Sequence, residues 1–236
     1  MPRLPRAVVP NFPHQVTQRG TNHQKVFFDD QDRRVYLKLL QLYAEEYSLA
    51  INGYCLMLNH VHLVATPSDE TCLASALGRT HGDYSRYVHA KHGGCGHLWQ
   101  ARFYSCVLSE SHRWWALAYV ENNPVRVGAA RLASDYAWSS AAAHAGGAAS
   151  RFPLADEVWL REYGPDRWRM VLETDIYQES LAERLRQATA AGRPFGDDGF
   201  VARMEIELDR PLKAQRRGPT RAEADPRQLV LLAIAR

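Results

Sequence analysis

The stretch that decides the fold is YCLMLNHVHLV, residues 54–64. Apolar residues fill both sides of Leu58-Asn59, which predicts two strands, over 49–58 and 61–66, joined by a tight turn. Residues i and i+2 of a strand project from the same face, so His60 and His62 point one way and Val61 the other. Two imidazoles placed in this way can bind one divalent metal ion. An isolated His-x-His pair is more often two half-buried histidines on a sheet, so the motif alone decides nothing about chemistry.

The flanking segments predict the rest of a small α+β domain. Before the hairpin, 14–18 alternates like a strand and 29–47 carries the apolar stripe of a helix. After it we expect a helix over 71–89, a fourth strand over 103–108, and a third helix capped by Ser111 and stopped by Pro124. The order β-α-β-β-α-β with one further helix is that of the ferredoxin-like, split β-α-β fold.

The composition changes after residue 140. An Ala/Gly/His stretch over 141–149 is typical of a linker or of a frayed helix end. Short helices are expected beyond it, over 157–163, 167–187 and 200–208. We therefore expect a core domain over 1–147 and a helical, basic extension over 148–236, whose cations Lys213, Arg216, Arg217 and Arg221 are suited to contacting phosphates.

Composition narrows the class of protein. The chain has 236 residues, of which 46% are hydrophobic and 23% charged, with a formal net charge of +3. No apolar run is long enough to span a bilayer, and the N-terminus lacks the apolar core of a signal peptide. The four cysteines form no CxxC pair, which argues against a zinc knuckle or a disulfide framework. These features predict a cytoplasmic protein without membrane contact.

A second motif lies in the third predicted helix. Tyr119 and Asn123 are four residues apart, so they share one helix face. A phenol would then lie beside an amide oxygen able to complete a metal site begun by two histidines. The alternative is ordinary as well, because a tyrosine near a helix end usually packs and an asparagine before proline is a common helix stop.

Together these blocks resemble the REP-associated tyrosine transposases, which are single-tyrosine members of the HUH superfamily. Residues 54–64 resemble their HUH signature, and YVENNPVRVG (119–128) resembles their tyrosine helix. GHLWQARF (96–103) and YAWSS (136–140) resemble two further blocks of the same core, and the likeness covers about residues 1 to 145. In the tail, GRPFG (192–196) and RRGP (216–219) resemble the extension of some members. Leu58 stands where such proteins usually carry proline, and Glu121-Asn122 replaces a commoner His-Leu, but neither change removes a reacting group.

The resemblance implies a metal-dependent endonuclease and strand transferase that cuts and rejoins single-stranded or hairpin DNA such as REP sequences. Tyr119 would be the nucleophile, forming a 5′-phosphotyrosine, and His60, His62 and Asn123 would bind Mg²⁺ or Mn²⁺. Arg19, Arg102 and Arg126 are candidates for holding phosphates. Such an enzyme would be associated with the nucleoid.

Two alternatives remain open from sequence. One is a domesticated, sequence-specific DNA-binding regulator that keeps the fold and has lost catalysis. The other is a metal phosphodiesterase that uses water as nucleophile and leaves Tyr119 as a packing residue. The oligomeric state is also open between monomer and homodimer.

Overall fold

The fold is built on one four-stranded antiparallel sheet. The computed structural model describes residues 6–174 and 179–212. The strands β1 (His14–Arg19), β2 (Leu49–Met57), β3 (His60–Pro67) and β4 (Tyr104–Val107) lie in the order β2-β3-β1-β4. Helix α1 (Asp30–Glu46) follows β1 and helix α2 (Cys72–His92) follows β3. This connectivity confirms the predicted ferredoxin-like arrangement.

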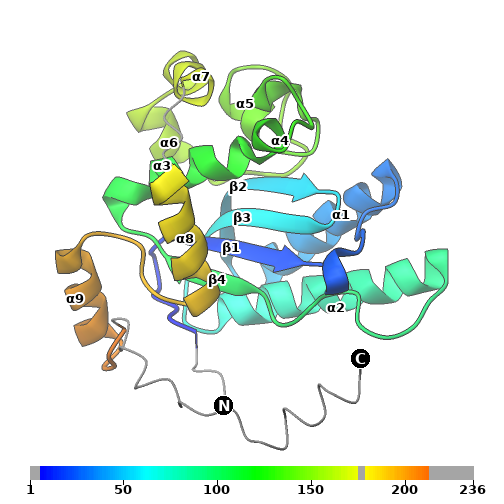
Figure 1. The fold of residues 1–236 in the computed structure, drawn as a ribbon, viewed down its shortest axis with the longest axis horizontal. Helices are drawn as coiled ribbons and strands as arrows, with labels where there is room; N and C mark the ends of the chain where they lie inside the picture. The colour runs from blue at the N-terminus through cyan, green and yellow to red at the C-terminus, as the bar shows by residue number, and fades with distance from the viewer. Residues whose placement is uncertain (1–5, 175–178, 213–236) are drawn as a thin grey trace, which may run out of the picture.

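One face of the sheet is covered by α1 and α2 (Figure 1). Strand residues such as Val16, Val61 and Leu63 point into this layer and belong to its apolar core. Helix α1 begins with a capping box, in which Asp29 accepts a bond from the Asp32 N–H and the Asp32 side chain accepts one from the Asp29 N–H. We call this layer the α1/α2 face.

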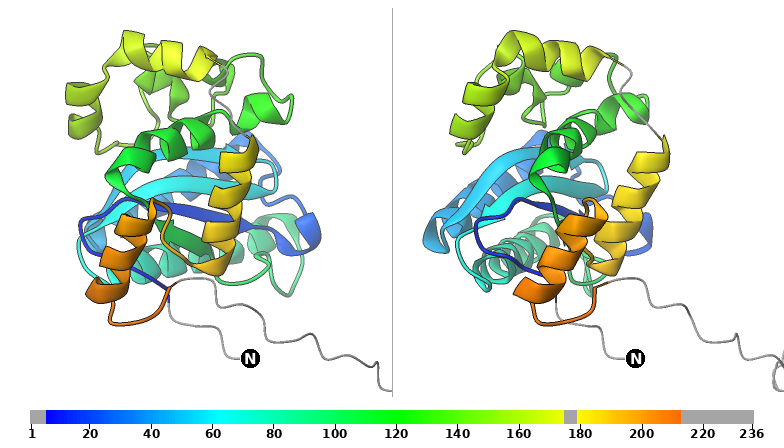
Figure 2. Two further views of the ribbon diagram at one scale, coloured as in Figure 1. Left: turned by 60° about the vertical axis from the view of Figure 1, so that its left-hand side comes forward. Right: turned by 90° about the vertical axis from the view of Figure 1, so that its left-hand side faces the viewer.

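The opposite face is covered by α3 (Glu110–Glu121) and α8 (Glu179–Ala191), as Figures 1 and 2 show. Gly53 in β2 lets α3 approach closely, because a Cβ there would lie 2.2 Å from Leu117 Cδ1. The prediction that Ser111 caps this helix is wrong. The N-cap is Ser109, whose backbone is extended (φ −70°, ψ 159°), and Ser111 lies inside the first turn. We call this layer the α3/α8 face.

The remaining elements lie around these layers. Beyond the β2 edge of the sheet lie the short helices α4 (Asn123–Arg126), α5 (Ala141–His144), α6 (Glu157–Glu162) and α7 (Pro165–Glu173) (Figure 1). Helix α9 (Asp198–Glu207) packs near the N-terminal segment. Two short 3-10 helices, η1 (Thr21–His23) and η2 (Ala133–Asp135), complete the described elements. The expectation of one helix over 167–187 is wrong, because Thr174 is extended (φ −77°, ψ 134°) and ends α7 before α8 begins. None of the helices within the described ranges combines the length and apolarity needed to cross a bilayer.

Candidate active site

The β2–β3 hairpin places the two histidines. The turn at Leu58-Asn59 is as tight as predicted, and β3 begins at His60. Across the ladder, Arg19 in β1 lies opposite His60 and Thr17 lies opposite His62. The two imidazole centroids are 4.9 Å apart and the rings are nearly perpendicular. Both side chains therefore lie together on the α3/α8 face, as the alternation of a strand requires.

A neighbouring amide fixes the His60 ring. Asn59 Nδ2 donates to the His23 carbonyl at 3.1 Å, so the Asn59 amide oxygen must be the atom that faces His60. That oxygen lies 2.6 Å from His60 Nδ1 and accepts its proton. Nε2 is therefore the nitrogen with the lone pair, which is the form in which a histidine binds a metal ion.

Burial and positive charge keep both histidines neutral. Burial, with Arg19 and Arg126 adding to it, lowers the pKa of His60 to about 4. Burial also holds the pKa of His62 well below its usual value, and the neighbouring His60 and Arg126 lower it further. Neutral imidazoles are metal ligands, and the two guanidinium groups make this end of the sheet attractive to a phosphate.

Tyr119 faces this pair from α3. Its ring lies 6.1 Å from the His62 ring and perpendicular to it, and Trp115 stacks on it at 5.7 Å. The Arg126 guanidinium lies 5.7 Å from the centre of the tyrosine ring. The side chain is only 4% exposed. The structure thus brings a phenol, two imidazoles and an arginine into one cluster.

Asn123 lies one turn beyond Tyr119 and is fully buried. Its Nδ2 donates to the Tyr119 carbonyl at 3.0 Å, and its Oδ1 accepts a bond from Arg126 Nη2 at 2.9 Å. The amide oxygen predicted to bind metal is therefore turned toward Arg126. The two imidazoles suit a divalent ion in this structure, whereas the Asn123 oxygen could join them only by using its second lone pair or by losing the bond from Arg126.

The other predicted cations do not join this cluster. Arg102 is exposed in the loop before β4, and none of the contacts in the described ranges connects it with the histidines. Trp99, close to it in sequence, is buried in the core of the α1/α2 face and donates its Nε1–H to the His81 carbonyl at 3.1 Å. Lys213, Arg216, Arg217 and Arg221 lie outside the described residues.

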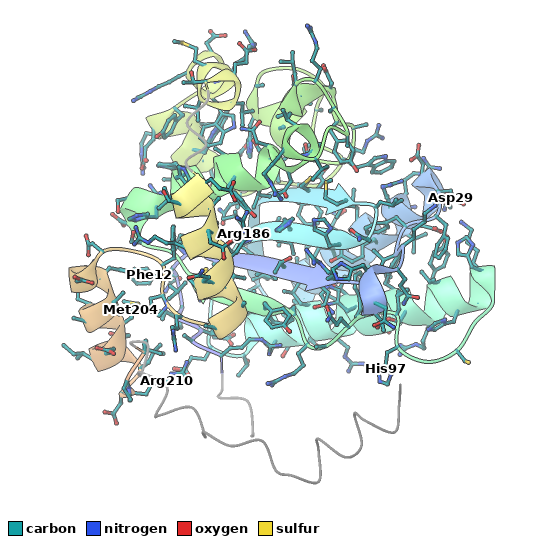
Figure 3. All side chains as sticks on the ribbon, in the orientation of Figure 1. Phe12, Asp29, His97, Arg186, Met204 and Arg210 are labelled. Carbon is teal, nitrogen blue, oxygen red and sulfur yellow. The ribbon has the colours of Figure 1, made fainter. Side chains whose placement is uncertain are left out.

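A second group of possible metal ligands is part of a helix cap. Asp29, Asp32 and His92 come close enough together to hold an ion. Lys91 Nζ already lies 2.7 Å from a carboxylate oxygen of each aspartate, and both aspartates form the α1 capping box. Figure 3 shows Asp29 at the margin of the molecule, far from Arg186 on α8. The lysine supplies the positive charge that an ion would otherwise bring.

Sequence reasoning missed a buried carboxylate on the tyrosine helix. Glu121 has no exposed surface and accepts a bond from the Ser140 hydroxyl. It also accepts from His144 Nδ1 at 2.6 Å and from Trp168 Nε1 at 2.8 Å. Glu121 therefore ties α3 to α5 and α7. A weak signal was present, because Glu121 lies four residues after the apolar Leu117 and shares its helix face, where a buried carboxylate would need partners.

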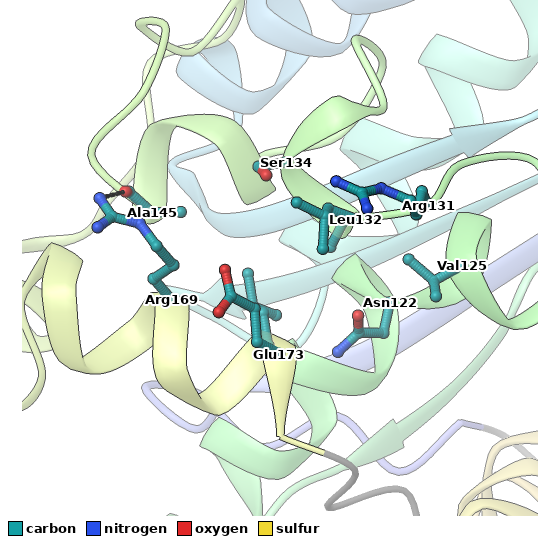
Figure 4. A pocket seen from close by; sticks show the side chains of 10 residues that line it. Asn122, Val125, Arg131, Leu132, Ser134, Ala145, Arg169 and Glu173 are labelled. Atoms are coloured by element: carbon teal, nitrogen blue, oxygen red, sulfur yellow. Dashed lines mark hydrogen bonds between the residues drawn. The ribbon is translucent and has the colours of Figure 1, made fainter.

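A separate pocket lies beyond the end of α3. It has a volume of about 250 Å³, and its lining includes Asn122, Val125, Arg131, Arg169 and Glu173 (Figure 4). Neither the histidine pair nor Tyr119 lines it. The pocket is thus distinct from the cluster described above.

The chain is similar to known proteins in sequence and in fold. Residues 13–123 match the family model described as IS200-like transposase. The structure of a REP-associated tyrosine transposase bound to a REP hairpin superposes with a TM-score of 0.53 and 16% identity, over 64% of this chain and 95% of that one. A crystal structure of a protein assigned as a transposase from Deinococcus radiodurans R1 gives a TM-score of 0.36 and 19% identity, over 52% of this chain and 97% of that one. No curated protein matches the sequence.

The fold and the family match define the class: the chain is an α+β enzyme of the transposase type. More particularly, residues 13–123, just under half of the chain, are similar to the family of IS200-like transposases.

Proposed function

We propose that the chain is a metal-dependent nuclease and strand transferase that cuts and rejoins single-stranded DNA with Tyr119 as its nucleophile. The observation that carries the proposal is the placement of Tyr119, which lies perpendicular to His62 at 6.1 Å and next to Arg126. Packing alone does not require a tyrosine beside His62 and Arg126, at the end of the sheet where His60 and Arg19 also lie. The family match supports the same reaction.

The residues of the site have different roles in the cleavage of a phosphodiester. His60 and His62, with Asn123 once Arg126 releases it, would hold Mg²⁺ or Mn²⁺. Such an ion neutralises charge on the non-bridging oxygens and orients the scissile bond. Arg19 and Arg126 hold the phosphate, which also draws Arg126 away from the Asn123 oxygen.

Tyr119 supplies the attacking oxygen. The phenol loses its proton to solvent and its oxygen bonds to phosphorus, while the bond from phosphorus to the 3′ oxygen breaks and that oxygen takes up a proton. The products are a 5′-phosphotyrosine and a free 3′-hydroxyl. Because the phosphoester is kept on the enzyme, the reverse step can rejoin a strand without an external energy source.

The substrate we propose is hairpin DNA of the REP type. Support comes from the shared fold with a REP-associated transposase bound to a REP hairpin. The basic segment with Lys213, Arg216 and Arg217 would add phosphate contacts from the 148–236 extension, beside a catalytic domain over 1–147. An enzyme acting on such repeats would work at the nucleoid.

A single chain supplies the whole proposed set. Tyr119 faces the histidines of its own chain, because α3 packs directly on β2 and β3. No second copy is needed to complete the cluster, which supports a monomeric working unit.

The test is a cleavage assay on a labelled REP-type hairpin with a single-stranded flank. We expect cleavage with Mn²⁺ or Mg²⁺, none in excess EDTA, and a labelled protein band that survives denaturation. A fully paired duplex of the same sequence is the control and should remain intact. Cleavage in excess EDTA would contradict the role of the metal, and cleavage without a labelled protein band would point to water as the nucleophile.

A further inference from the structure

A buried chain of polar side chains leads from α8 to His62. Gln15 in β1 is 2% exposed, and its amide nitrogen lies 3.3 Å from His62 Nδ1. The other end of this amide accepts a bond from the hydroxyl of Thr189, which is 3% exposed on α8. The Thr189 hydroxyl also lies 2.8 Å from the Leu185 carbonyl and 3.2 Å from Cys106 Sγ. The partner of His62 on this side is thus Gln15, which is held in turn by Thr189, a residue about 125 positions after His62 in the chain.

The positions of these heavy atoms fit two hydrogen-bonding patterns, which differ in the atoms that donate. In the first, Thr189 donates to Gln15 Oε1 and Gln15 Nε2 donates to His62 Nδ1, so the His62 proton is on Nε2. In the second, the amide is turned end for end: His62 Nδ1–H donates to Gln15 Oε1, Gln15 Nε2 donates to Thr189 Oγ1, and the Thr189 proton goes to the Leu185 carbonyl. Amide nitrogen and oxygen are of similar size, so the exchange needs no repacking.

Only the second pattern makes His62 a metal ligand at Nε2. Passing to it removes a proton from Nε2 and adds one to Nδ1, both exchanged with water. His62 then matches His60, whose Nδ1 proton is already directed to Asn59. The difference between the two histidines is that Asn59 is oriented by a backbone carbonyl, which can only accept. Gln15 is oriented by a hydroxyl, which can donate or accept.

We propose that Gln15 and Thr189 are positioning residues that set the tautomer of His62, so that α8 is part of the metal site. The inference rests on the proposed function, because it concerns how the same site takes up its ion. A metal-bound histidine nearly always donates its other N–H to a neighbouring acceptor, and loss of that partner typically weakens metal binding 10- to 100-fold. Here the acceptor is an amide whose direction depends on one hydroxyl.

The test is Thr189→Val, which removes the hydroxyl at nearly constant volume. Titration calorimetry with Mn²⁺ should show binding weakened by about tenfold relative to the wild type. Thr189→Ser keeps the hydroxyl and should bind Mn²⁺ normally. The matched control is Thr80→Val, because Thr80 is another fully buried helical threonine that donates to the carbonyl four residues back, but in α2 on the opposite layer.

A second measurement reports the tautomer without metal. In ¹⁵N NMR spectra of the metal-free protein, His62 should be the Nδ1–H tautomer alone in the wild type and in Thr80→Val, and a mixture of the Nδ1–H and Nε2–H tautomers in Thr189→Val. Unchanged Mn²⁺ affinity with an unchanged His62 tautomer in Thr189→Val would overturn this inference and leave the proposed function standing. A wild type that binds no Mn²⁺ would overturn the proposed metal site. The tautomer spectra would then decide the role of Thr189 alone: a mixture in Thr189→Val would support it and a single form would overturn it.

Discussion

The two faces of the sheet are built differently. On the α1/α2 face, strand residues such as Val61 and Leu63 meet two helices that are close to them in sequence, and the layer is a continuous apolar core. On the α3/α8 face, the alternate residues His60 and His62 meet polar groups as well as apolar ones. Other buried polar groups of this face are paired with the C-terminal third of the chain, because Trp168 donates to Glu121 and Thr189 donates to Gln15.

The difference separates stability from chemistry along a single strand. His62 and Leu63 are neighbours in β3, yet they point into opposite layers. The α1/α2 face can supply most of the burial energy, because apolar area removed from water is its main content. The α3/α8 face can then keep buried polar groups. Each of these groups needs a hydrogen-bond partner, and a fold that depended on them alone would be less stable.

The largest effect is expected from changing these two neighbours one at a time. His62→Ala should lower strand cleavage by about a thousandfold or more, because it removes a proposed ligand of the ion that stabilises the transition state. Leu63→Ala should cost about 3 kcal/mol of unfolding free energy through the cavity it leaves. Cleavage rates per folded molecule and urea denaturation measure the two losses. Equal losses of cleavage in the two variants would contradict the separation of chemistry, on the α3/α8 face, from stability, on the α1/α2 face.

A smaller effect is expected at the buried carboxylate of the α3/α8 face. Glu121→Ala leaves Ser140, His144 and Trp168 without their acceptor and should cost about 3 kcal/mol of stability. The matched control is Glu162→Ala, because Glu162 also accepts from a tryptophan Nε1–H, that of Trp114, but its side chain is 36% exposed.

The control variant Glu162→Ala should lose less than about 1 kcal/mol of unfolding free energy, because water replaces the lost hydrogen bonds. Urea denaturation of both variants decides the matter. If the two losses of stability were similar, the Glu121 cluster would not be holding α3 to the helices beyond it.

The most gradual effect concerns pH and should have opposite signs at two buried histidines, His81 and His144. Burial lowers the pKa of His81, in α2, to about 3, so its contribution to stability is present above pH 6.5 and lost as the pH falls below that value. Burial alone would lower the pKa of His144, but the Glu121 carboxylate outweighs it and the pKa is raised. The contribution of His144 is therefore present below pH 6.5 and lost as the pH rises through the raised pKa.

Urea denaturation between pH 4 and pH 9 checks both signs. We expect His144→Gln to flatten the alkaline side of the stability curve and His81→Gln to flatten the acid side. An alkaline side that is unchanged in His144→Gln would contradict the pairing of His144 with Glu121.

The α1/α2 face and the hairpin could be predicted from sequence because their signals are local. Alternation over 54–64 fixes which residues share a face, and it placed His60 and His62 together. The helix spacing likewise placed Asn123 one turn after Tyr119. The four-strand order followed from the succession of elements.

The rest of the candidate site could not be predicted because it depends on contacts across long stretches of chain. Nothing in residues 14–18 indicates that Gln15 will meet Thr189, and the pairing arises only when α8 packs on β4 and β1. The hydrogen bond between Arg126 and the Asn123 oxygen is local, yet spacing alone does not say whether an amide turns to a cation or to a metal. The cap of α3 was missed for a similar reason, because Ser109 and Ser111 are both good cap residues.

Tyr119 is the residue that we expect to become covalently linked to the DNA. The direct measurement is peptide mass spectrometry of the covalent adduct formed with a hairpin substrate, together with the Tyr119→Phe variant, which loses one oxygen and keeps the ring. We expect a nucleotide on the peptide that contains Tyr119, and a variant that binds hairpin DNA and Mn²⁺ but forms no adduct and cuts no strand. A nucleotide on another tyrosine, or normal cleavage by Tyr119→Phe, would contradict this expectation.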